Sequence, residues 1–137
     1  MVQTRIAIST GCAFILHHAA QCAIRYAACR RQFQTIKGSD QERQLLDYQL
    51  HMDTLGKNLS LGVVMQLVTG DLAAMELQSG KEVENGSFKL LDILHHFSSG
   101  VKALFTELCY VGTDELRQAC GGAGFLLSSG IADWWAE

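Results

Sequence analysis

The sequence has 137 residues and a net charge of −3, with 48% apolar and 18% charged residues. This length suits one domain with an ordinary core, and the composition excludes an intrinsically disordered chain. The small negative charge excludes a chain that is drawn as a whole to nucleic acid or to an anionic membrane. No segment has the layout of a signal peptide or a long uninterrupted apolar run, so we also expect no membrane span.

The first predicted helix covers residues 5–33, where many small residues lie between larger apolar ones. Small side chains let neighbouring helices approach closely, which favours a helix inside a bundle. The sequence contains no proline, and this favours long helices joined by short turns. Gly38, a residue type that commonly ends helices, is the expected stop.

The second predicted helix covers residues 40–78. Ser39 and Glu42 have the spacing of a capping box, in which each side chain bonds a free backbone N–H of the first turn. Apolar residues then recur at helical spacing as far as Leu77. The expected end of this helix is Ser79-Gly80.

The third predicted helix covers residues 88–120 and has the clearest apolar stripe. The stripe consists of Leu90, Leu94, Phe97, Val101, Leu104, Leu108 and Val111, spaced alternately by four and three residues. Such a stripe predicts a helix that packs along its neighbours at a shallow angle. The helix is expected to stop at the glycine-rich turn Gly121-Gly122-Ala123-Gly124.

Together the three helices predict an all-α fold, an up-down bundle of long helices in which residues 1–137 form a single domain. The bundle is incomplete, because each of the three helices leaves a flank that a fourth helix would normally cover. That flank is either the docking surface of a partner or the result of a truncated chain.

Neither the cysteines nor the histidines form a recognisable metal site or catalytic set. The five cysteines include no CxxC pair, so we expect small buried thiols in a reducing compartment. His17-His18 and His95-His96 are adjacent pairs, and neighbours on a helix point about 100° apart, too far to share one ion. His51 is isolated. We therefore predict no metal ion.

Two segments admit both a structural and a ligand-binding interpretation. The glycines of the turn could simply end a helix, but several glycines together also let backbone amides approach a ligand. Arg30 and Arg31 could complement the dipole at a helix C-terminus, or their guanidinium groups could bind phosphate. Composition alone does not separate these interpretations.

The same two segments resemble the acyl-CoA oxidase and dehydrogenase superfamily. Residues 26–33, Tyr-Ala-Ala-Cys-Arg-Arg-Gln-Phe, resemble the family's YAxxRxQF helix end. Residues 117–125, Arg-Gln-Ala-Cys-Gly-Gly-Ala-Gly-Phe, resemble its QxxGGxGF segment, and the two motifs stand in the family's order. The Ala-Cys before the glycines and the later Ser128-Ser129-Gly130 resemble the oxidase branch more than the dehydrogenases.

The resemblance implies an acyl-CoA dehydrogenase-type C-terminal helical domain that contributes to an FAD site. The resemblance places Arg30 against the pyrophosphate of FAD, with Gln32 and Phe33 lining the cofactor beside it. It implies that Gln118, Gly121 and Gly122 bring main-chain and amide donors to the same flavin. It also implies a homodimer in which these segments reach the FAD of the neighbouring subunit. A peroxisomal location follows from the family alone.

The implied reaction is FAD-dependent α,β-oxidation of an acyl-CoA to the trans-2-enoyl-CoA with release of hydrogen peroxide, in fatty acid β-oxidation. No catalytic residue is assigned here, because the family's glutamate lies downstream in a Tyr/Phe-Glu-Gly context that Glu137 lacks. We therefore expect a partial acyl-CoA oxidase that is inactive alone. The alternatives are a non-catalytic helical interaction module derived from this family and a fragment of an acyl-CoA dehydrogenase.

Overall fold

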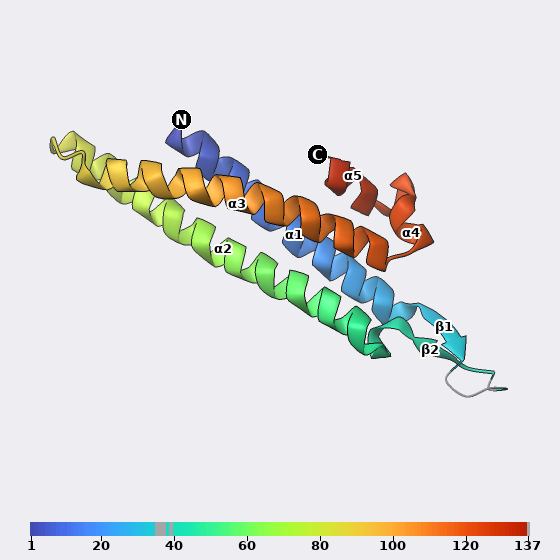
Figure 1. Cartoon of the computed structure of the whole chain (residues 1–137). Coiled ribbons are helices and arrows are strands. Elements are labelled where there is room, and N and C mark those ends of the chain that lie inside the picture. Colours follow the sequence, from blue (N-terminus) through green and yellow to red (C-terminus); the bar gives the residue numbers. More distant parts are fainter. Residues whose placement is uncertain (35–37, 39, 137) are drawn as a thin grey trace.

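The computed structural model of this chain describes residues 1–34, 38 and 40–136. Its three long helices are α1 (Val2–Cys29), α2 (Gln49–Glu84) and α3 (Lys89–Ala119). They run up, down and up along an elongated bundle, so that α1 and α3 point the same way and α2 the opposite way (Figure 1). The predicted up-down bundle of long helices is confirmed.

Small side chains on α1 form the centre of the bundle. Ala13, Ala20, Ala23 and Ala27 are at most 1% exposed, and Leu16 among them is fully buried. The larger side chains that complete this cluster come mainly from the other two helices and include Leu55, Met65, Phe105 and Leu116. Alanines on α1 allow α2 and α3 to pack close, and burial of each large side chain contributes about 1.5–3 kcal/mol.

A short antiparallel hairpin joins α1 to α2, although no strand was expected. Its strands are β1 (Arg31–Gln34) and β2 (Glu42–Gln44), followed by the 3-10 helix η1 (Leu45–Asp47). The first predicted helix therefore ends at Cys29 instead of residue 33, and the second begins at Gln49 instead of residue 40.

Hydrogen bonds from the last residue of the hairpin and from the residue after it explain why α1 stops early. The N–H of Leu45 donates to the carbonyl of Arg30 at 2.9 Å, and the Gln44 side chain donates to the carbonyl of Ala28. These tertiary contacts satisfy carbonyls that a longer helix would use, so they override local helix propensity. The predicted capping box is wrong at Glu42, which lies in β2, while Ser39 lies outside the described residues.

The other two predicted helix ends differ from the observed ones in opposite directions, since α2 ends later than predicted and α3 ends one residue earlier. Helix α2 continues through Ser79, which is 3% exposed, and the glycine that follows its end is Gly86. Gly86 has a φ of +81°, and its N–H donates to the carbonyl of Val83 at 2.9 Å. Helix α3 matches its predicted range within one residue at either end and stops at the glycine turn, as expected.

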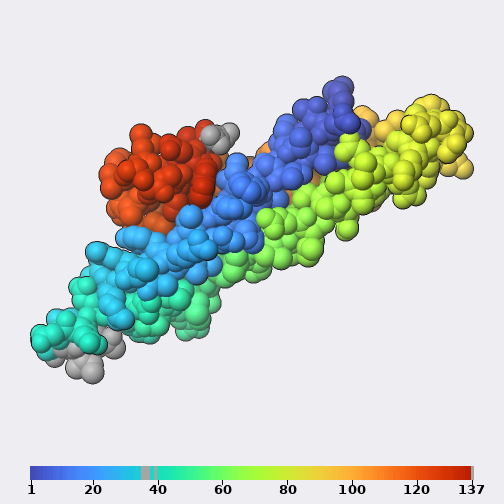
Figure 2. Space-filling view, turned by 180° about the vertical axis from the view of Figure 1, so that it is seen from behind, coloured from blue at the N-terminus to red at the C-terminus, as the bar shows by residue number. Residues whose placement is uncertain are grey.

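From the glycine turn onward the chain folds back along the bundle in three short pieces, the first of which includes most of the turn. These are α4 (Gly122–Phe125), the 3-10 helix η2 (Leu127–Ser129) and α5 (Ile131–Ala136). Ile131 is 4% exposed and joins the main core cluster, with Trp134 packed against it. Figure 2 shows this C-terminal segment as a raised mass beside α1, apart from the hairpin at one tip and the α2–α3 turn at the other.

The bundle leaves part of the predicted α3 stripe open. Phe97, Leu104 and Val111 are 44–55% exposed, whereas Ser98 and Thr113, outside the stripe, are at most 1% exposed. The stripe was therefore predicted correctly as apolar but only partly as the packing face. The space against α1 and α2 is narrow and accepts small groups, which leaves the larger side chains of one flank without cover.

Two further expectations concern the cysteines and the membrane. All five cysteines are free; burial raises the pKa of Cys109 and of Cys120 to about 11, while Cys29 is exposed, contrary to expectation. By length and composition alone α1 and α2 could each cross a membrane. Helices packed in the core of a bundle pass the same test, so this observation is weak evidence for a span.

Candidate functional site

The hairpin and the glycine turn lie at the same end of the bundle, although they are far apart in sequence (Figure 1). A cavity of about 580 Å³ lies between them. Five of the six positions predicted at the cofactor line it: Arg30, Gln32, Gln118, Gly121 and Gly122. The sixth, Phe33, lines a cavity of about 540 Å³ that shares Gln118 with the first. The fold thus brings the two motifs together.

The two arginines at the end of α1 have different surroundings. Arg30 follows the last helical residue and lines the cavity, and no carboxylate of the described residues forms an ion pair with it. Arg31 belongs to β1, and its Nη1 donates to the carbonyl of Glu42 at 3.2 Å. Arg30 therefore retains free guanidinium donors for a ligand, whereas Arg31 supports the hairpin.

Phe33 is held in an unusual backbone conformation. Its φ is +64°, in the left-handed region that non-glycine residues rarely adopt, and its side chain is 67% exposed. The register explains this: Arg31 pairs with Gln44 and Gln34 with Glu42, so β1 carries one extra residue, as in a β-bulge. Tyr48 also fixes this segment, because its Oη donates to the carbonyl of Gln32 at 2.9 Å.

The three glycines of the turn have separate reasons to be glycine. Gly121 has a φ of +57°, which disfavours any side chain. Gly124 lies so close to α3 that a Cβ there would overlap the carbonyl oxygen of Arg117. A Cβ on Gly122 would meet no described atom within 4 Å, and Gly122 faces the cavity. Packing therefore does not require the absence of a side chain at Gly122, and its bare backbone is open to a ligand.

Gln118 lines both cavities but is already engaged. Its Nε2 donates to Oδ2 of Asp114 at 2.6 Å. The other oxygen of the same carboxylate accepts two bonds from Arg117, at 2.6 and 3.1 Å. The expectation that Gln118 brings an amide donor to the cofactor therefore meets a competing partner within the chain.

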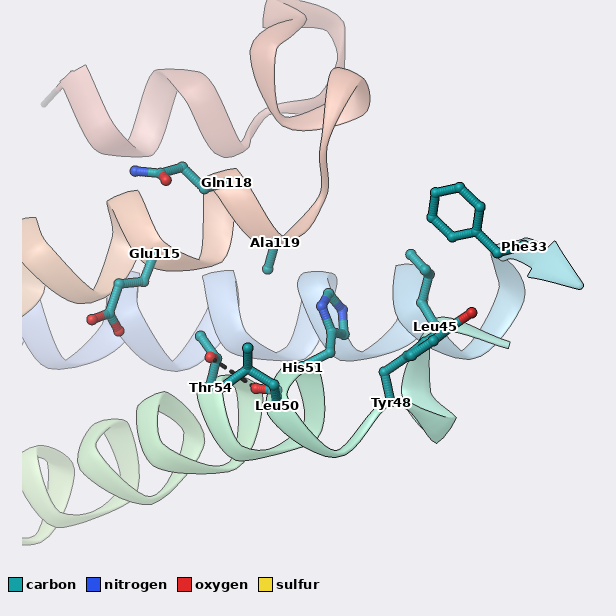
Figure 3. Close-up of a pocket in the computed structure, with 9 residues that line it drawn as sticks. All are labelled: Phe33, Leu45, Tyr48, Leu50, His51, Thr54, Glu115, Gln118 and Ala119. Carbon is teal, nitrogen blue, oxygen red and sulfur yellow. Dashed lines mark hydrogen bonds between the residues drawn. The ribbon is translucent and has the colours of Figure 1, made fainter. Parts of the chain in front are cut away.

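His51 is the residue of this region that the sequence did not single out. It stands in the first turn of α2 and lines both cavities, of which Figure 3 shows the one that Phe33 also lines. Its Nε2 is buried and bonds no atom of the described residues. Because α2 was predicted to start nine residues too early, no pattern placed His51 at a helix terminus beside Arg30.

Glu115, paired with Lys57, lines the cavity of about 540 Å³ on the side opposite Phe33 (Figure 3). Glu115 accepts hydrogen bonds from Lys57 Nζ at 2.7 Å and from Asn58 Nδ2 at 2.8 Å, and Asn58 is fully buried. These two hydrogen bonds, that from Lys57 first, hold the pKa of Glu115 below its usual range. Glu115 is thus a fixed anion that ties α2 to α3 beside the cavity.

The chemistry of the region suits a large polar ligand with an anionic part. It offers one free guanidinium, bare backbone and an exposed aromatic ring. Among the described residues no group of three or more His, Cys, Asp or Glu could hold a metal ion. The arrangement can bind and orient such a ligand.

Comparison with known proteins identifies the family. The model of the acyl-CoA oxidase C-alpha1 domain matches residues 1–137. The chain belongs to the acyl-CoA oxidase family. The resemblance inferred from the two motifs is confirmed, and it extends over the whole chain.

Individual relatives agree with this assignment. Peroxisomal acyl-coenzyme A oxidase 2 of Mus musculus is 34% identical over 116 residues, which cover 85% of this chain and 17% of that protein. Acyl-CoA oxidase 1 of Arabidopsis thaliana superposes with a TM-score of 0.91 at 30% identity, over 99% of this chain and 20% of that one. Acyl-CoA oxidase-1 of Caenorhabditis elegans, complexed with FAD and ATP, also has a TM-score of 0.91, at 31% identity over 98% of this chain and 21% of that one. The chain thus spans about a fifth of the length of these relatives.

Proposed function

We propose that this chain supplies the FAD-contacting helical domain of an acyl-CoA oxidase. The observation that carries the proposal is the convergence of Arg30, Gln32 and the glycine turn on one cavity. These residues lie far apart in the sequence, and the two motifs alone predict them as cofactor contacts. The C. elegans relative, whose structure contains FAD, supports the same cofactor.

The residues present fit a dinucleotide. Arg30 can give bidentate hydrogen bonds to a pyrophosphate, and the bare backbone at Gly122 admits close approach of its oxygens. The exposed ring of Phe33 offers a flat apolar surface to an aromatic group. FAD, when bound, would supply the capacity to accept the two electrons of acyl-CoA oxidation, while this chain's residues bind and orient it.

The wider assignment follows from the family. The complete enzyme would oxidise an acyl-CoA to its trans-2-enoyl-CoA and release hydrogen peroxide, in the peroxisome that the mouse relative's name indicates. It would act as a homodimer in which the cavity faces the FAD of the other subunit; the uncovered Phe97, Leu104 and Val111 are consistent with further packing partners. The chain alone would be inactive, since no base is assigned within it.

Flavin content tests this proposal directly. In the complete oxidase that contains this sequence, Arg30→Ala should weaken the affinity for FAD about tenfold. The amount of FAD bound per subunit, measured by flavin absorbance after gel filtration, should fall accordingly. Arg31→Ala is the matched control, because its guanidinium serves the hairpin. Equal flavin content in both variants and the parent would contradict the assignment.

Peroxide release tests the branch of the family. The complete oxidase, without any substitution, should form hydrogen peroxide from an acyl-CoA and oxygen without an added electron acceptor. Turnover only with an acceptor would favour the dehydrogenase alternative. A folded protein that binds neither FAD nor acyl-CoA would favour the interaction module.

A further inference from the structure

Helix α2 carries two stripes at helical spacing, one buried and one exposed. The buried stripe includes Leu55, Met65 and Leu72 and packs inside the bundle. The exposed one, here called the outer stripe, recurs at alternating spacings of four and three residues and consists of Gly56, Ser60, Val63, Leu67, Gly70, Ala74 and Leu77. In both views α2 forms one long edge of the bundle, with no other described element beyond it (Figure 1, Figure 2). The outer stripe thus has the spacing of a helix-packing face but no partner in the described chain.

The outer stripe combines large exposed side chains with a glycine that the fold does not require. Val63, Leu67 and Leu77 are 41–74% exposed. Glycine inside a helix is destabilising relative to alanine, so it needs a reason. At Gly62, in the buried stripe, an added Cβ would lie 3.0 Å from the Cα of His17. An added Cβ on Gly56 or Gly70 would meet no described atom within 4 Å, so these two glycines are explained by close approach of something outside the chain.

Charged residues mark both ends of the outer stripe. Asp53 and Lys81 continue its spacing by one step in either direction, and both are exposed. Neither forms an ion pair with a described residue. Residues 58–75, between these ends, contain a single charged residue, Asp71. The outer stripe therefore has a negative end, a positive end and an almost uncharged centre.

The sizes of the side chains match an antiparallel second copy of the same helix. A two-fold axis at Leu67 brings positions at equal distances before and after this residue opposite each other. Gly56 then faces Leu77 of the second copy, and Gly70 faces Val63. Each large side chain away from the axis meets a glycine, which lets the two helices approach closely.

The charges favour the same arrangement. In the antiparallel pair, Asp53 of each copy faces Lys81 of the other, so opposite charges meet at both ends of the contact. A parallel pair would bring the two Asp53 carboxylates together, and likewise the two Lys81 ammonium groups. Size and charge thus agree on one occupant and one direction.

We propose that α2 is a self-association surface: two copies of this chain pair antiparallel through their outer stripes, with Leu67 at the two-fold axis. The surface is separate from the candidate FAD site, since no member of the outer stripe lines either of its cavities. From Asp53 to Lys81 the contact is about 40 Å long. One pair of helices of this length is at the small end of specific interfaces, so the association is reversible, with a Kd in the micromolar range.

Sedimentation equilibrium of the 137-residue chain over a range of concentrations tests the surface. The chain should change from monomer to dimer, and Leu67→Glu should raise the Kd at least tenfold because two carboxylates then meet at the axis, about the least favourable place for like charges. Leu104→Glu is the matched control: Leu104 is 55% exposed on α3 and should leave the Kd unchanged. Circular dichroism should show the same helix content in all three proteins.

Two results would overturn the proposal. A chain that stays monomeric at every concentration would mean that another segment of the complete oxidase, or a different protein, covers the outer stripe. A dimer that resists Leu67→Glu and is lost in Leu104→Glu would place the contact on α3 instead.

Exchanging the charges tests the direction of the pair. Asp53→Lys and Lys81→Asp should each weaken the dimer about fivefold, because each creates a like-charge contact at both ends. The double variant Asp53→Lys/Lys81→Asp restores opposite charges and should recover the Kd to within about twofold. A double variant as weak as the sum of its single changes would overturn the antiparallel arrangement.

Filling the space at Gly56 tests the close approach. Gly56→Leu should weaken the dimer about tenfold, because its side chain would occupy the place of Leu77 from the second copy. Gly100→Leu is the control, since Gly100 is exposed on α3 and an added Cβ there meets no described atom within 4 Å. An equal Kd in both variants would contradict the pairing.

None of these measurements uses flavin, so the self-association and the proposed function can fail separately. A monomeric chain whose complete oxidase loses FAD on Arg30→Ala would refute the self-association alone. A dimeric chain whose complete oxidase keeps FAD on Arg30→Ala would refute the proposed function alone.

Discussion

The two ends of the bundle are built differently. At the α2–α3 turn, two long helices meet through one positive-φ glycine, Gly86, and the adjacent cavity is lined mainly by apolar residues and glycine. At the opposite end, α1 gives way to a bulged hairpin with Phe33 in the left-handed region, and α3 ends in three glycines. The second end also holds Arg30, which forms no ion pair with a described residue, and His51 Nε2, which bonds no described atom.

The difference shows where this fold departs from its most stable form. Strained backbone and unpartnered polar groups cost stability, and they persist where surrounding structure enforces them. Here the strained Phe33 and the unpartnered His51 nitrogen lie at the two cavities, while other buried unpartnered polar atoms of the described residues, on His17, Asn58 and Trp135, lie elsewhere in the bundle. The backbone strain at Phe33 agrees with the proposed placement of the site, and four predictions test the contrast between the two ends.

The largest expected effect comes from Gly124→Ala. Its methyl group would overlap the carbonyl of Arg117, so the free energy of unfolding should fall by about 3 kcal/mol in urea denaturation. Gly122→Ala is the matched control and should change stability by less than about 0.5 kcal/mol, since its Cβ meets no described atom, while weakening FAD binding. Equal destabilisation by both would remove the distinction between packing and ligand glycines.

At Phe33, glycine should be better tolerated than alanine. Both Phe33→Gly and Phe33→Ala remove the ring, but only glycine removes the left-handed strain. The glycine variant should therefore be more stable than the alanine variant by about 1 kcal/mol in the same denaturation experiment. The reverse order would show that this end stores no backbone strain.

At the regular end, Gly80→Ala should stabilise the chain by somewhat less, about 0.8 kcal/mol. Gly80 lies inside α2, and an added Cβ there would meet no described atom within 4 Å. FAD affinity of the complete oxidase should not change. A loss of stability would mean that this end is not the simple helical region described above.

The smallest effect concerns pH and Glu115. Because hydrogen bonds lower its pKa in the folded state, Glu115 contributes stability above the usual carboxyl pKa, and this is lost as pH falls through the lowered value. Its side chain is 33% exposed, so the contribution should be below about 1 kcal/mol. Glu115→Gln should make the free energy of unfolding depend less on pH between about 5 and 3, the range in which carboxyl groups titrate, as measured by thermal unfolding. Exposed Glu107→Gln, on the same helix, should not.

The long helices and the glycine turn could be predicted because their signals are local. The α3 stripe and the glycines stand next to one another in sequence, and each acts on its own segment. The packing face of α3 could not be predicted in full: Ser98 is buried and Leu104 is exposed because of what α1 and α2 present to them.

The hairpin and two features of the site depend on contacts that no local pattern reveals. Gln44 and Leu45 donate hydrogen bonds to the carbonyls of Ala28 and Arg30, and so end α1 early. The hairpin that follows delays the start of α2 to Gln49, which places His51 in its first turn. The predicted position of Gln118 was useful, but the direction of its amide depends on Asp114, four residues earlier. Sequence motifs thus predicted the candidate site residues, whereas the pairing of Gln118 with Asp114 could not be predicted from them.

The most direct test of the central claim is a structure of the complete oxidase determined with FAD bound. The pyrophosphate should lie within hydrogen-bonding distance of the Arg30 guanidinium and beside the backbone of Gly121 and Gly122. FAD bound elsewhere, with the hairpin and the glycine turn both facing solvent, would contradict the account.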